Sequence, residues 1–583
     1  MLRLPQFRRP PNLAILTAAG LFLAFLAFGV SSHPSFTVHA AASSTPLLPI
    51  SIDYPEAGSI FPPGIPAPTF LWRDAAGKSW VIDVVFEDGA SPLHLAIQAG
   101  HMQMGEIDPD TVSESNEMPK LTPQEAATFT WKPDAGTWTK IQAHSIAGPA
   151  TFAITGYREG KPWSASRVAF TTSKDEVAAP IFYRDVPLMP TANTSGHVSP
   201  LASASVPLIH WRLRDIRKSE SHTVLKDMPT CANCHSFSAD GKTFGMDIDG
   251  PANDKGLYAV VPVQKQMTID SKDMLHWKSD GALGTARVGF MSQLSPDGRY
   301  VLSTFAGPSV KSMIDSYYVT NFLDYRFLQV FYPTKGILEF YDRKDGLRHP
   351  LPGADDPKYV QTDGVWSRDG KWIVFARAAA REPRTRGQRP ALYSMDENET
   401  QIQYDLYRIP FNDGRGGTPE RIAGASENGM SNNFPKISPD GKWIVFVQCR
   451  SGQLMRPDSQ LYIVPFAGGT ARRMRANTRL MNSWHSFSPN GRWLVFSSKA
   501  RSPYTQMYLT HIDANGNDSP AILIDNATAA NRAVNIPEFV NIAGDGIEEI
   551  KVKVADEATR VANAKEKGMP KSKSSIANGE FKR

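Results

Sequence analysis

The amino-acid sequence predicts an all-β protein, and three observations lead to this fold class. Short runs of alternating apolar and polar residues, broken by prolines and turns, follow residue 46. Five later segments align on an Asp-Gly or Asn-Gly pair and repeat one order of strand, turn and strand. A length of 583 residues exceeds one ordinary core, so at least two domains are expected.

The N-terminus has the features of an export signal. Several arginines precede an unbroken, weakly polar run over residues 13–30, and small residues follow around Ala40. This run is longer than the usual signal-peptide core and barely long enough to span a membrane. Residues 1–45 are therefore predicted to be a cleaved signal peptide or a retained N-terminal membrane anchor. Both alternatives place the rest of the chain outside the cytoplasm, and the charge pattern favours the periplasm.

Residues 46–175 read as short strands, among them PTFLWRD, WVIDVVFEDG, ATFTWKP, ATFAITGYREG and ASRVAFTTS. Alternation over four to eight positions without helical periodicity predicts an antiparallel sandwich of immunoglobulin or fibronectin-III type. Nothing in this region has a catalytic pattern. We interpret it as a spacer or docking domain.

Five repeated segments follow this region in the sequence. They are HSFSADGKTFGM at 235, SQLSPDGRYVLSTF at 292, GVWSRDGKWIVFAR at 364, PKISPDGKWIVFVQ at 435 and HSFSPNGRWLVFSS at 485. In each, proline where present presets φ for the turn, and glycine accepts a positive φ. The outgoing strand is apolar on both faces, as a strand buried between stacked sheets must be.

Each repeat continues into a second hairpin, so each unit has four strands. Four-stranded units at such intervals are typical of a β-propeller. We predict six blades, with seven as the alternative, over residues 176–555. The segments IFYRDVP and PLIHWRLRDI, together with the segment from Asn535, could supply the remaining strands and close the ring by pairing the chain ends. Residues 556–583 are predicted to be a flexible tail.

The repeats SPDGKWIVF and SPNGRWLVFSS resemble the TolB-type propeller repeat of bacterial periplasmic proteins, over roughly residues 230–545. The resemblance implies a propeller that serves as an interaction platform, as the lid of a peptidase or as the carrier of an added site. The chain has no Gly-x-Ser-x-Gly motif, so the peptidase form is not expected.

One short motif carries chemistry. Cys231-Ala232-Asn233-Cys234-His235 has the Cys-x-x-Cys-His spacing of c-type haem attachment. Two thiols three positions apart can form thioethers with one porphyrin edge, and the adjacent histidine can be the proximal iron ligand. The motif predicts one covalent haem c, and export agrees with it because c-type attachment takes place outside the cytoplasm.

Three other interpretations of the motif stay open. The cysteines could form a redox disulfide, although no thioredoxin-like pattern surrounds them. With His235 they could bind zinc, although the sequence shows no fourth ligand. His235 could also be only a residue of the repeat, since His485 occupies the same register without cysteines. Cys449, the third cysteine, is interpreted as a small buried strand residue.

The opposite axial position has four candidates. Met481 and Met430 lie in loops that lead into two other inner strands, Met291 immediately precedes a third, and His485 lies within one. Each methionine taken alone is better explained by packing. Methionine ligation would favour electron transfer, whereas an open position would favour ligand binding or peroxide chemistry.

The predicted function is an exported monohaem c-type cytochrome in periplasmic electron transfer, working with redox partner proteins. The alternative is a non-catalytic scaffold that binds envelope proteins. An enzyme is the less favoured alternative, because the sequence shows no recognisable acid/base or nucleophile cluster. Asp240, Asp297, Asp369 and Asp440 form a row of carboxylates, but each is a turn residue. The formal charge of +5 is thinly spread and no nucleic-acid motif is present, so nucleic acid is not an expected partner.

Overall fold

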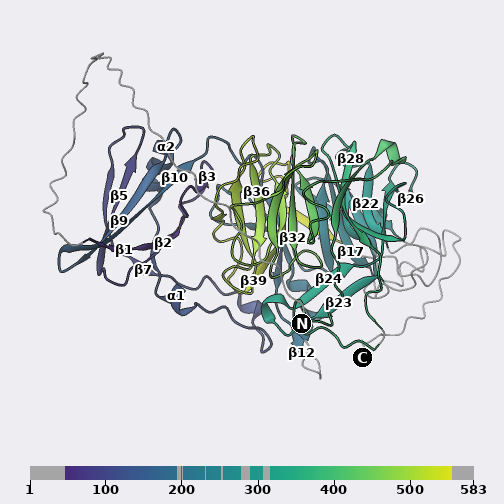
Figure 1. Cartoon of the computed structure of the whole chain (residues 1–583), viewed down its shortest axis with the longest axis horizontal. Helices are drawn as coiled ribbons and strands as arrows, with labels where there is room; N and C mark the ends of the chain where they lie inside the picture. The colour runs from purple at the N-terminus through teal and green to yellow at the C-terminus, as the bar shows by residue number, and fades with distance from the viewer. Residues whose placement is uncertain are drawn as a thin grey trace, which may run out of the picture. The chain divides into compact units, whose positions relative to one another are not determined.

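The structure is a computed structural model that describes residues 46–192, 198–199, 201, 203–229, 231–250, 254–277, 289–305, 316–385 and 387–553 (Figure 1). The predicted anchor over residues 13–30 and the predicted tail over residues 556–583 lie outside these residues. Within the described ranges, no helix has the length and apolar character to span a membrane.

The N-terminal region folds into two sheets. The larger has the order β1 (Leu48–Pro49), β10 (Lys161–Thr172), β9 (Ala150–Arg158), β5 (Ser79–Phe86) and β6 (Leu93–Ile97), with β3 (Ile60–Phe61) also pairing with β10. The smaller has the order β2 (Ser51–Tyr54), β4 (Phe70–Arg73), β8 (Phe129–Trp131) and β7 (Gly100–His101). Phe70 of one sheet stacks on Phe152 of the other, with ring centroids 4.6 Å apart. The alternating residues of the sequence thus place one apolar face of each sheet in a common core.

This region also contains helices that the sequence reading missed. They are η1 (Pro109–Thr111), α1 (Pro123–Ala126) and α2 (Ala135–His144). Asp134 caps α2 by accepting a hydrogen bond from the Thr137 N–H at 2.9 Å. The helix buries Trp138 and Ile141. With only two core residues and a glycine and threonines in its first turns, it has little helical periodicity to detect.

The rest of the described chain is dominated by six four-stranded antiparallel sheets. The first two are β15 (His222–Leu225), β14 (His210–Arg214), β11 (Ile181–Pro187) and β39 (Arg532–Phe539), then β16 (Ala232–Phe237), β17 (Thr243–Gly250), β18 (Asp254–Pro262) and β20 (Met274–His276). The next two are β21 (Phe290–Leu294), β22 (Tyr300–Phe305), β25 (Ile337–Asp342) and β26 (Leu347–Pro350), then β27 (Tyr359–Trp366), β28 (Trp372–Ala379), β29 (Asp405–Pro410) and β30 (Glu420–Arg421). The last two are β31 (Ser431–Ile437), β32 (Trp443–Cys449), β33 (Gln460–Pro465) and β34 (Arg472–Arg473), then β35 (Asn482–Phe487), β36 (Trp493–Ser498), β37 (Gln506–His511) and β38 (Ile522–Leu523).

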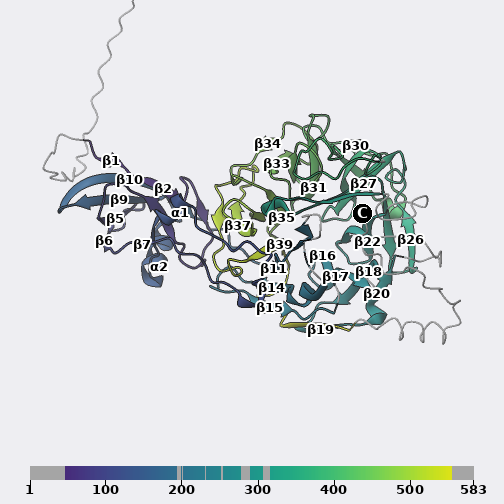
Figure 2. The same cartoon turned by 90° about the horizontal axis from the view of Figure 1, so that it is seen from below.

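These sheets form a β-propeller. One end strand of each sheet packs against that of the next sheet, in the order β16, β21, β27, β31, β35 and β39. We call these the inner strands, and Figure 2 shows the sheets arranged around a common axis. The ring is closed where β39, near the C-terminus, pairs antiparallel with β11, with Phe182 opposite Glu538. Pairing of the chain ends covers the sheet edge that an open ring would leave exposed.

Smaller elements complete the described chain. They are the strand pairs β12 (Thr191–Ala192) with β13 (Val198–Ser199), β23 (Tyr317–Asn321) with β24 (Gln329–Pro333) and β19 (Gln266–Ile269) with β40 (Glu549–Val552), and the short helices η2 (Ser203–Leu208), η4 (Ser271–Asp273), η6 (Tyr325–Phe327) and η7 (Asn412–Gly414). The segment from Asn535 was expected to supply a strand and turn of a blade, and its first part does so as β39. After the turn, β40 pairs parallel with β19, which gives that short edge strand a hydrogen-bonding partner.

The repeated turns explain the row of aspartates. Asp240 Oδ1 accepts hydrogen bonds from the Ser238 hydroxyl at 2.7 Å and from the Lys242 N–H at 3.0 Å. Gly241 follows with φ of +72°, the conformation for which glycine is required. The same pair of bonds recurs at Asp297, Asp369 and Asp440. These carboxylates hold turns, as the sequence predicts.

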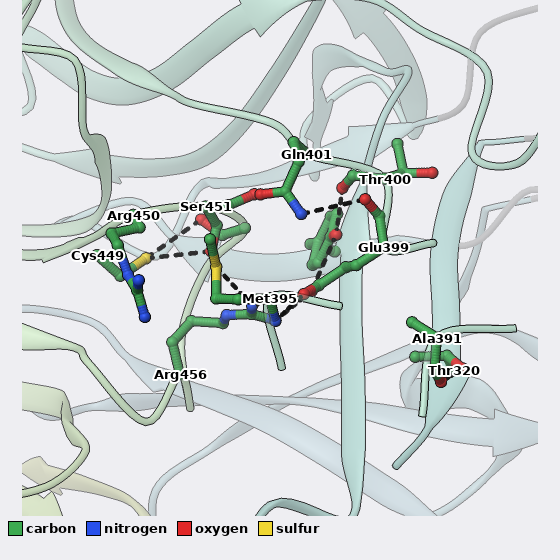
Figure 3. Close-up of polar contacts among 12 residues, drawn as sticks. Thr320, Ala391, Met395, Glu399, Thr400, Gln401, Cys449, Arg450, Ser451 and Arg456 are labelled. Atoms are coloured by element: carbon green, nitrogen blue, oxygen red, sulfur yellow. Dashed lines mark hydrogen bonds and ion pairs between the residues drawn. The ribbon is translucent and has the colours of Figure 1, made fainter. Parts of the chain in front are cut away.

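A buried ion pair fastens the long connection between β28 and β29 (Figure 3). Arg456, whose side chain is 0% exposed, makes two hydrogen bonds to the equally buried Glu399. Cys449 lies in the same region and is fully buried at the end of β32, which confirms its interpretation as a core strand residue.

Candidate functional site

The inner strand of each of the six sheets carries a β-bulge near its middle. In each, three residue steps on one strand face two on its partner, so two residues are left without a regular cross-strand pair. The bulged residues are Asn233–Cys234, Met291–Ser292, Asp363–Gly364, Phe434–Pro435, Trp484–His485 and Ile536–Pro537. The bulges therefore form a ring at one level of the propeller.

Five of these bulges place a non-glycine residue in the left-handed region. The φ angles are 55° at Met291, 55° at Asp363, 50° at Phe434, 49° at Trp484 and 51° at Ile536. Each such residue costs about 1–2 kcal/mol in backbone energy. Strained residues of this kind gather at functional sites when the surrounding structure holds them. The repeated strain therefore marks the bulged residues of the inner strands as a candidate functional site.

Most of these bulges line one small cavity. Its volume is about 20 Å³. Its walls combine the apolar side chains of Met291, Phe434, Trp484 and Ile536 with the polar groups of Cys234, His235, Gln293, Lys436, His485, Ser486 and Glu538. A cavity of this size holds about one water molecule. Thiol, imidazole, ammonium and carboxylate groups from four strands thus meet at one point of the propeller.

The Cys-x-x-Cys-His motif lies at the start of the second sheet. The strand of this sheet does not begin after the motif, because β16 already begins at Ala232. Its bulge is one residue earlier in the repeat than that of β35, so His235 pairs with Met246 whereas His485 is itself bulged. Ala232 to His235 of the motif therefore lie within the strand, which accommodates them by shifting its bulge by one residue.

The two motif thiols are free and half-buried, and they face different surroundings. Cys231 Sγ lies 3.7 Å from Arg184 Nη2. Cys234 Sγ lies 3.6 Å from Met291 Sδ, at the cavity. Burial is the main cause that raises the pKa of the Cys234 thiol, so this sulfur is a neutral thiol in the folded, haem-free chain.

The His235 imidazole is buried without a hydrogen-bond partner. The residue is 1% exposed, and neither ring nitrogen makes a hydrogen bond. Glu538 Oε2 lies 3.6 Å from Nε2, and the charges of Lys436 and Arg184 and the Phe182 backbone also act on the ring. The ring packs edge-to-face on Phe182, with centroids 4.8 Å apart. Burial lowers the pKa of His235 to about 3, so the ring is neutral and has a lone pair to offer.

His485 is the internal comparison, because it holds the same register of the repeat. It is also 1% exposed and packs edge-to-face on an aromatic ring, that of Phe434. Its Nε2, however, is hydrogen-bonded to the Val445 carbonyl oxygen at 2.9 Å. At His485 the histidine therefore has a structural role, because it bonds to a neighbouring strand. His235 makes no such bond.

Charged groups surround the cavity. Burial lowers the pKa of Lys436, and Glu538 and Asp363 act against this shift as nearby negative charges. Burial raises the pKa of Glu538 to about 7 and that of Asp363 to about 6. Asp363 is stabilised by the Phe434 N–H, which donates to Oδ2 at 3.0 Å. The three groups form a coupled set whose net charge changes near neutral pH.

The structure separates the four candidates for the opposite axial position. Met291 and His485 line the same cavity as Cys234 and His235. Met481 is fully buried in the core and Met430 is half-buried, and neither contributes to the cavity wall. The sequence reading missed Lys436 and Glu538, although their lysine and glutamate side chains on inner strands were a detectable signal.

The donor atoms of the motif fit haem c, but the cavity beside them is too small for it. Two free thiols and an imidazole with an unused lone pair are the groups that attachment requires. A cavity of about 20 Å³ does not contain a porphyrin, so loading requires the lining side chains to move. For the zinc interpretation, the described ranges contain no group of three or more His, Cys, Asp or Glu placed to hold a metal ion.

Comparisons with known proteins give fold likeness alone. No protein-family model and no curated protein sequence matches the chain. Among solved structures, TolB from Acinetobacter baumannii is 14% identical with a TM-score of 0.37, covering 67% of this chain and 79% of that one. A nidogen/laminin complex is 8% identical with a TM-score of 0.35, covering 62% and 98%. Hydrazine synthase from Kuenenia stuttgartiensis is 13% identical with a TM-score of 0.31, covering 69% and 98%. At such values none of them carries an argument about function.

Proposed function

We propose that the chain is an exported monohaem c-type cytochrome built on a β-propeller, which passes or stores single electrons outside the cytoplasm. Cys231 and Cys234 would form the two thioethers, and His235 would be the proximal ligand of one haem c. The export signal read from the sequence supports the location, because the attachment chemistry belongs to the same compartment.

The observation that carries this proposal is the contrast between the two histidines of the repeat. His485 Nε2 is hydrogen-bonded to the Val445 carbonyl oxygen and only its Nδ1 lacks a partner, whereas neither nitrogen of the equally buried His235 has a partner at hydrogen-bond geometry, although the Phe182 backbone lies near the ring. A buried polar group without a partner costs about 1–3 kcal/mol. Such a cost is retained where the group has another task, and the task that two neighbouring thiols indicate is iron ligation.

The chain's own residues would hold and tune the group. Phe182 and Glu538, which are cross-strand partners on β11 and β39, would both restrain His235, the first through its edge-to-face ring contact and the second from 3.6 Å. Phe434, Trp484 and Ile536 present apolar surface that excludes water from the inner ring. When bound, haem iron supplies the one-electron chemistry, and the low polarity and nearby charges set its potential.

The test is covalent haem on one defined peptide. The chain is expressed with a working c-type maturation system and assayed by pyridine haemochrome, and residues 227–242 are then isolated as a single tryptic peptide that contains both thiols and His235. We expect one haem per chain on this peptide, no attachment in a Cys231→Ala/Cys234→Ala variant, and unchanged attachment in His485→Ala. Recovery of the wild-type peptide with both thiols unmodified would refute the proposal.

A second candidate is a scaffold that binds envelope proteins. It is favoured by a hollow of about 650 Å³ near the turns, lined in part by Asp297, Tyr300, Trp366, Arg368 and Asp369. A volume in this range suits a bound segment with apolar and charged groups. The scaffold predicts that partner capture survives in the double cysteine variant, whereas Trp366→Ala and Arg368→Ala abolish it.

A further inference from the structure

The hollow of about 650 Å³ beside the repeated turns is lined by an aromatic cluster. Tyr300, Trp366 and Phe411 pack on one another, with ring centroids 4.6 Å apart for Trp366 and Phe411 and 4.9 Å apart for Tyr300 and Phe411. Tyr300 and Phe411 are buried, whereas Trp366 is only half-buried. The Trp366 indole is therefore the ring of this cluster that offers most surface to a ligand.

Carboxylates outnumber cations around the aromatic cluster. The hollow is lined by one cationic side chain, that of Arg368, and by four carboxylates, those of Asp240, Asp297, Asp369 and Asp413. Burial raises the pKa of Tyr300 most, and the charges of Asp413 and Asp297 add to this shift, so both carboxylates lie close enough to act on one ring. The chain as a whole has a formal charge of +5. The negative excess is thus a local feature of the hollow.

The charged groups of the hollow are held in place before any ligand binds. Asp297 Oδ1 accepts hydrogen bonds from the Ser295 hydroxyl at 2.5 Å and from the Arg299 N–H at 3.0 Å. Within the described ranges its Oδ2 accepts no hydrogen bond and has no ion-pair partner. Arg368 Nη1 donates to the Pro489 carbonyl oxygen at 3.3 Å, and its other N–H groups remain free to donate to a bound peptide backbone. Groups fixed in this way lose little side-chain freedom on binding.

From this arrangement we propose that the hollow binds a segment of a partner protein through an arginine side chain of that segment. The guanidinium of the segment lies over the Trp366 indole and is neutralised by Asp297 and Asp413. Tryptophan is the aromatic residue that attracts a cation most strongly. Arginine suits the site better than lysine, because its planar group both stacks on rings and pairs with carboxylates. This inference rests on the scaffold function, the second candidate, and does not depend on haem.

The test uses the full chain and short peptides with blocked ends that differ only at their centre. The probes are acetyl-Gly-Leu-Arg-Leu-Gly-amide and its variants with glutamine or glutamate in place of arginine, and isothermal titration calorimetry measures the dissociation constants. We expect the arginine peptide to bind about tenfold more tightly than the glutamine peptide, and the glutamate peptide not to bind. Added salt should reduce this preference. Equal affinities for the arginine and glutamine peptides, or no binding of the arginine peptide, overturn the proposal.

Matched variants separate the hollow from the other turns of the propeller. Asp297→Asn removes a carboxylate of the hollow but keeps the turn, because the repeat at 485 already has Asn490 there, whose Oδ1 accepts a hydrogen bond from the Ser488 hydroxyl at 2.6 Å. Asp440→Asn makes the same change in a turn that does not line the hollow. We expect about fivefold weaker binding of the arginine peptide in Asp297→Asn and none of this loss in Asp440→Asn. Equal losses in the two variants would indicate unspecific charge attraction and overturn the proposal.

The remaining variants distinguish this inference from the two candidate functions. Trp366→Ala should weaken binding of the arginine peptide about tenfold. If Trp366→Ala abolishes partner capture while the arginine and glutamine peptides bind equally, the scaffold function stands and the arginine-bearing partner is wrong. The Cys231→Ala/Cys234→Ala variant should bind the arginine peptide as the wild type does, because neither cysteine lines the hollow. A loss of binding in this variant contradicts the inference, whereas absence of haem from the wild type refutes the cytochrome function alone.

Discussion

Arg456→Met should destabilise the propeller strongly, because it leaves a buried carboxylate without its cation. Both side chains of the Arg456–Glu399 pair are 0% exposed (Figure 3). Breaking such a pair by removing one partner costs about 3–5 kcal/mol. Glu399 keeps the Met395 N–H as a donor at 2.7 Å and a share of the single Tyr332 hydroxyl proton, which lies 3.3 Å from Glu399 Oε1 and 2.5 Å from the Thr400 carbonyl oxygen by donor–acceptor distance. These remaining bonds place the expected loss at the lower end, about 3 kcal/mol.

The matched variants separate charge burial from simple loss of packing. Arg456→Met combined with Glu399→Gln removes both charges, and we expect it to recover most of the loss, because no unpaired charge is then left buried. Arg421→Met breaks the exposed pair with Glu427 and should cost less than about 0.5 kcal/mol. Urea denaturation followed by tryptophan fluorescence measures all three. The reasoning would be refuted if the free energy of unfolding of Arg456→Met were within about 1 kcal/mol of the wild type, or if the double variant were no more stable than Arg456→Met.

Three further predictions concern the inner ring and its turns. In the haem-free chain, His235→Phe should raise stability by about 1 kcal/mol and His485→Phe should lower it by about 1–3 kcal/mol, because only the second loses a buried hydrogen bond; equal effects in thermal melts would contradict this. Gly241→Ala should cost clearly more than Gly370→Ala, since both need φ near +70° but only the first brings Cβ to 2.1 Å from a backbone oxygen; equal denaturation midpoints would contradict it. The folded-state pKa of Asp363 is raised to about 6 from about 3.9 unfolded, so the folded state binds more protons between these values and loses about 2–3 kcal/mol of stability as pH rises through them. The free energy of unfolding of Asp363→Asn should equal that of the wild type below pH 4 and exceed it above pH 6. Parallel pH profiles of stability would contradict this prediction.

The sequence predicted the propeller because its strands carry local signals. Turn residues at fixed offsets and outgoing strands apolar on both faces appear in every repeat, and the structure has the corresponding hairpins. Ring closure was also predictable, since IFYRDVP and the segment from Asn535 were apolar strands without a partner, and they now pair as β11 and β39. The thiols and His235 were found by their spacing alone, which is independent of the fold.

The surroundings of the motif were not predictable, because they depend on register and on distant segments. The bulge of β16 lies one residue earlier than that of β35, and nothing in the local sequence shows such a shift. Glu538 reaches His235 only through pairing of the two ends of the propeller. Helix α2 was not predicted, because a short helix with two core residues has almost no periodic pattern in its sequence.

The place of the motif in the ring follows from the same closure. Only the blade after the closing sheet has as its neighbour a strand contributed by the far end of the chain, and His235 lies on that blade, facing Phe182 and Glu538 of the closing sheet. The imidazole therefore acquires its carboxylate when β39 pairs with β11, so the site is complete only in the closed ring. Under the proposed function, the surroundings of His235 would therefore depend on a long-range pairing of the fold.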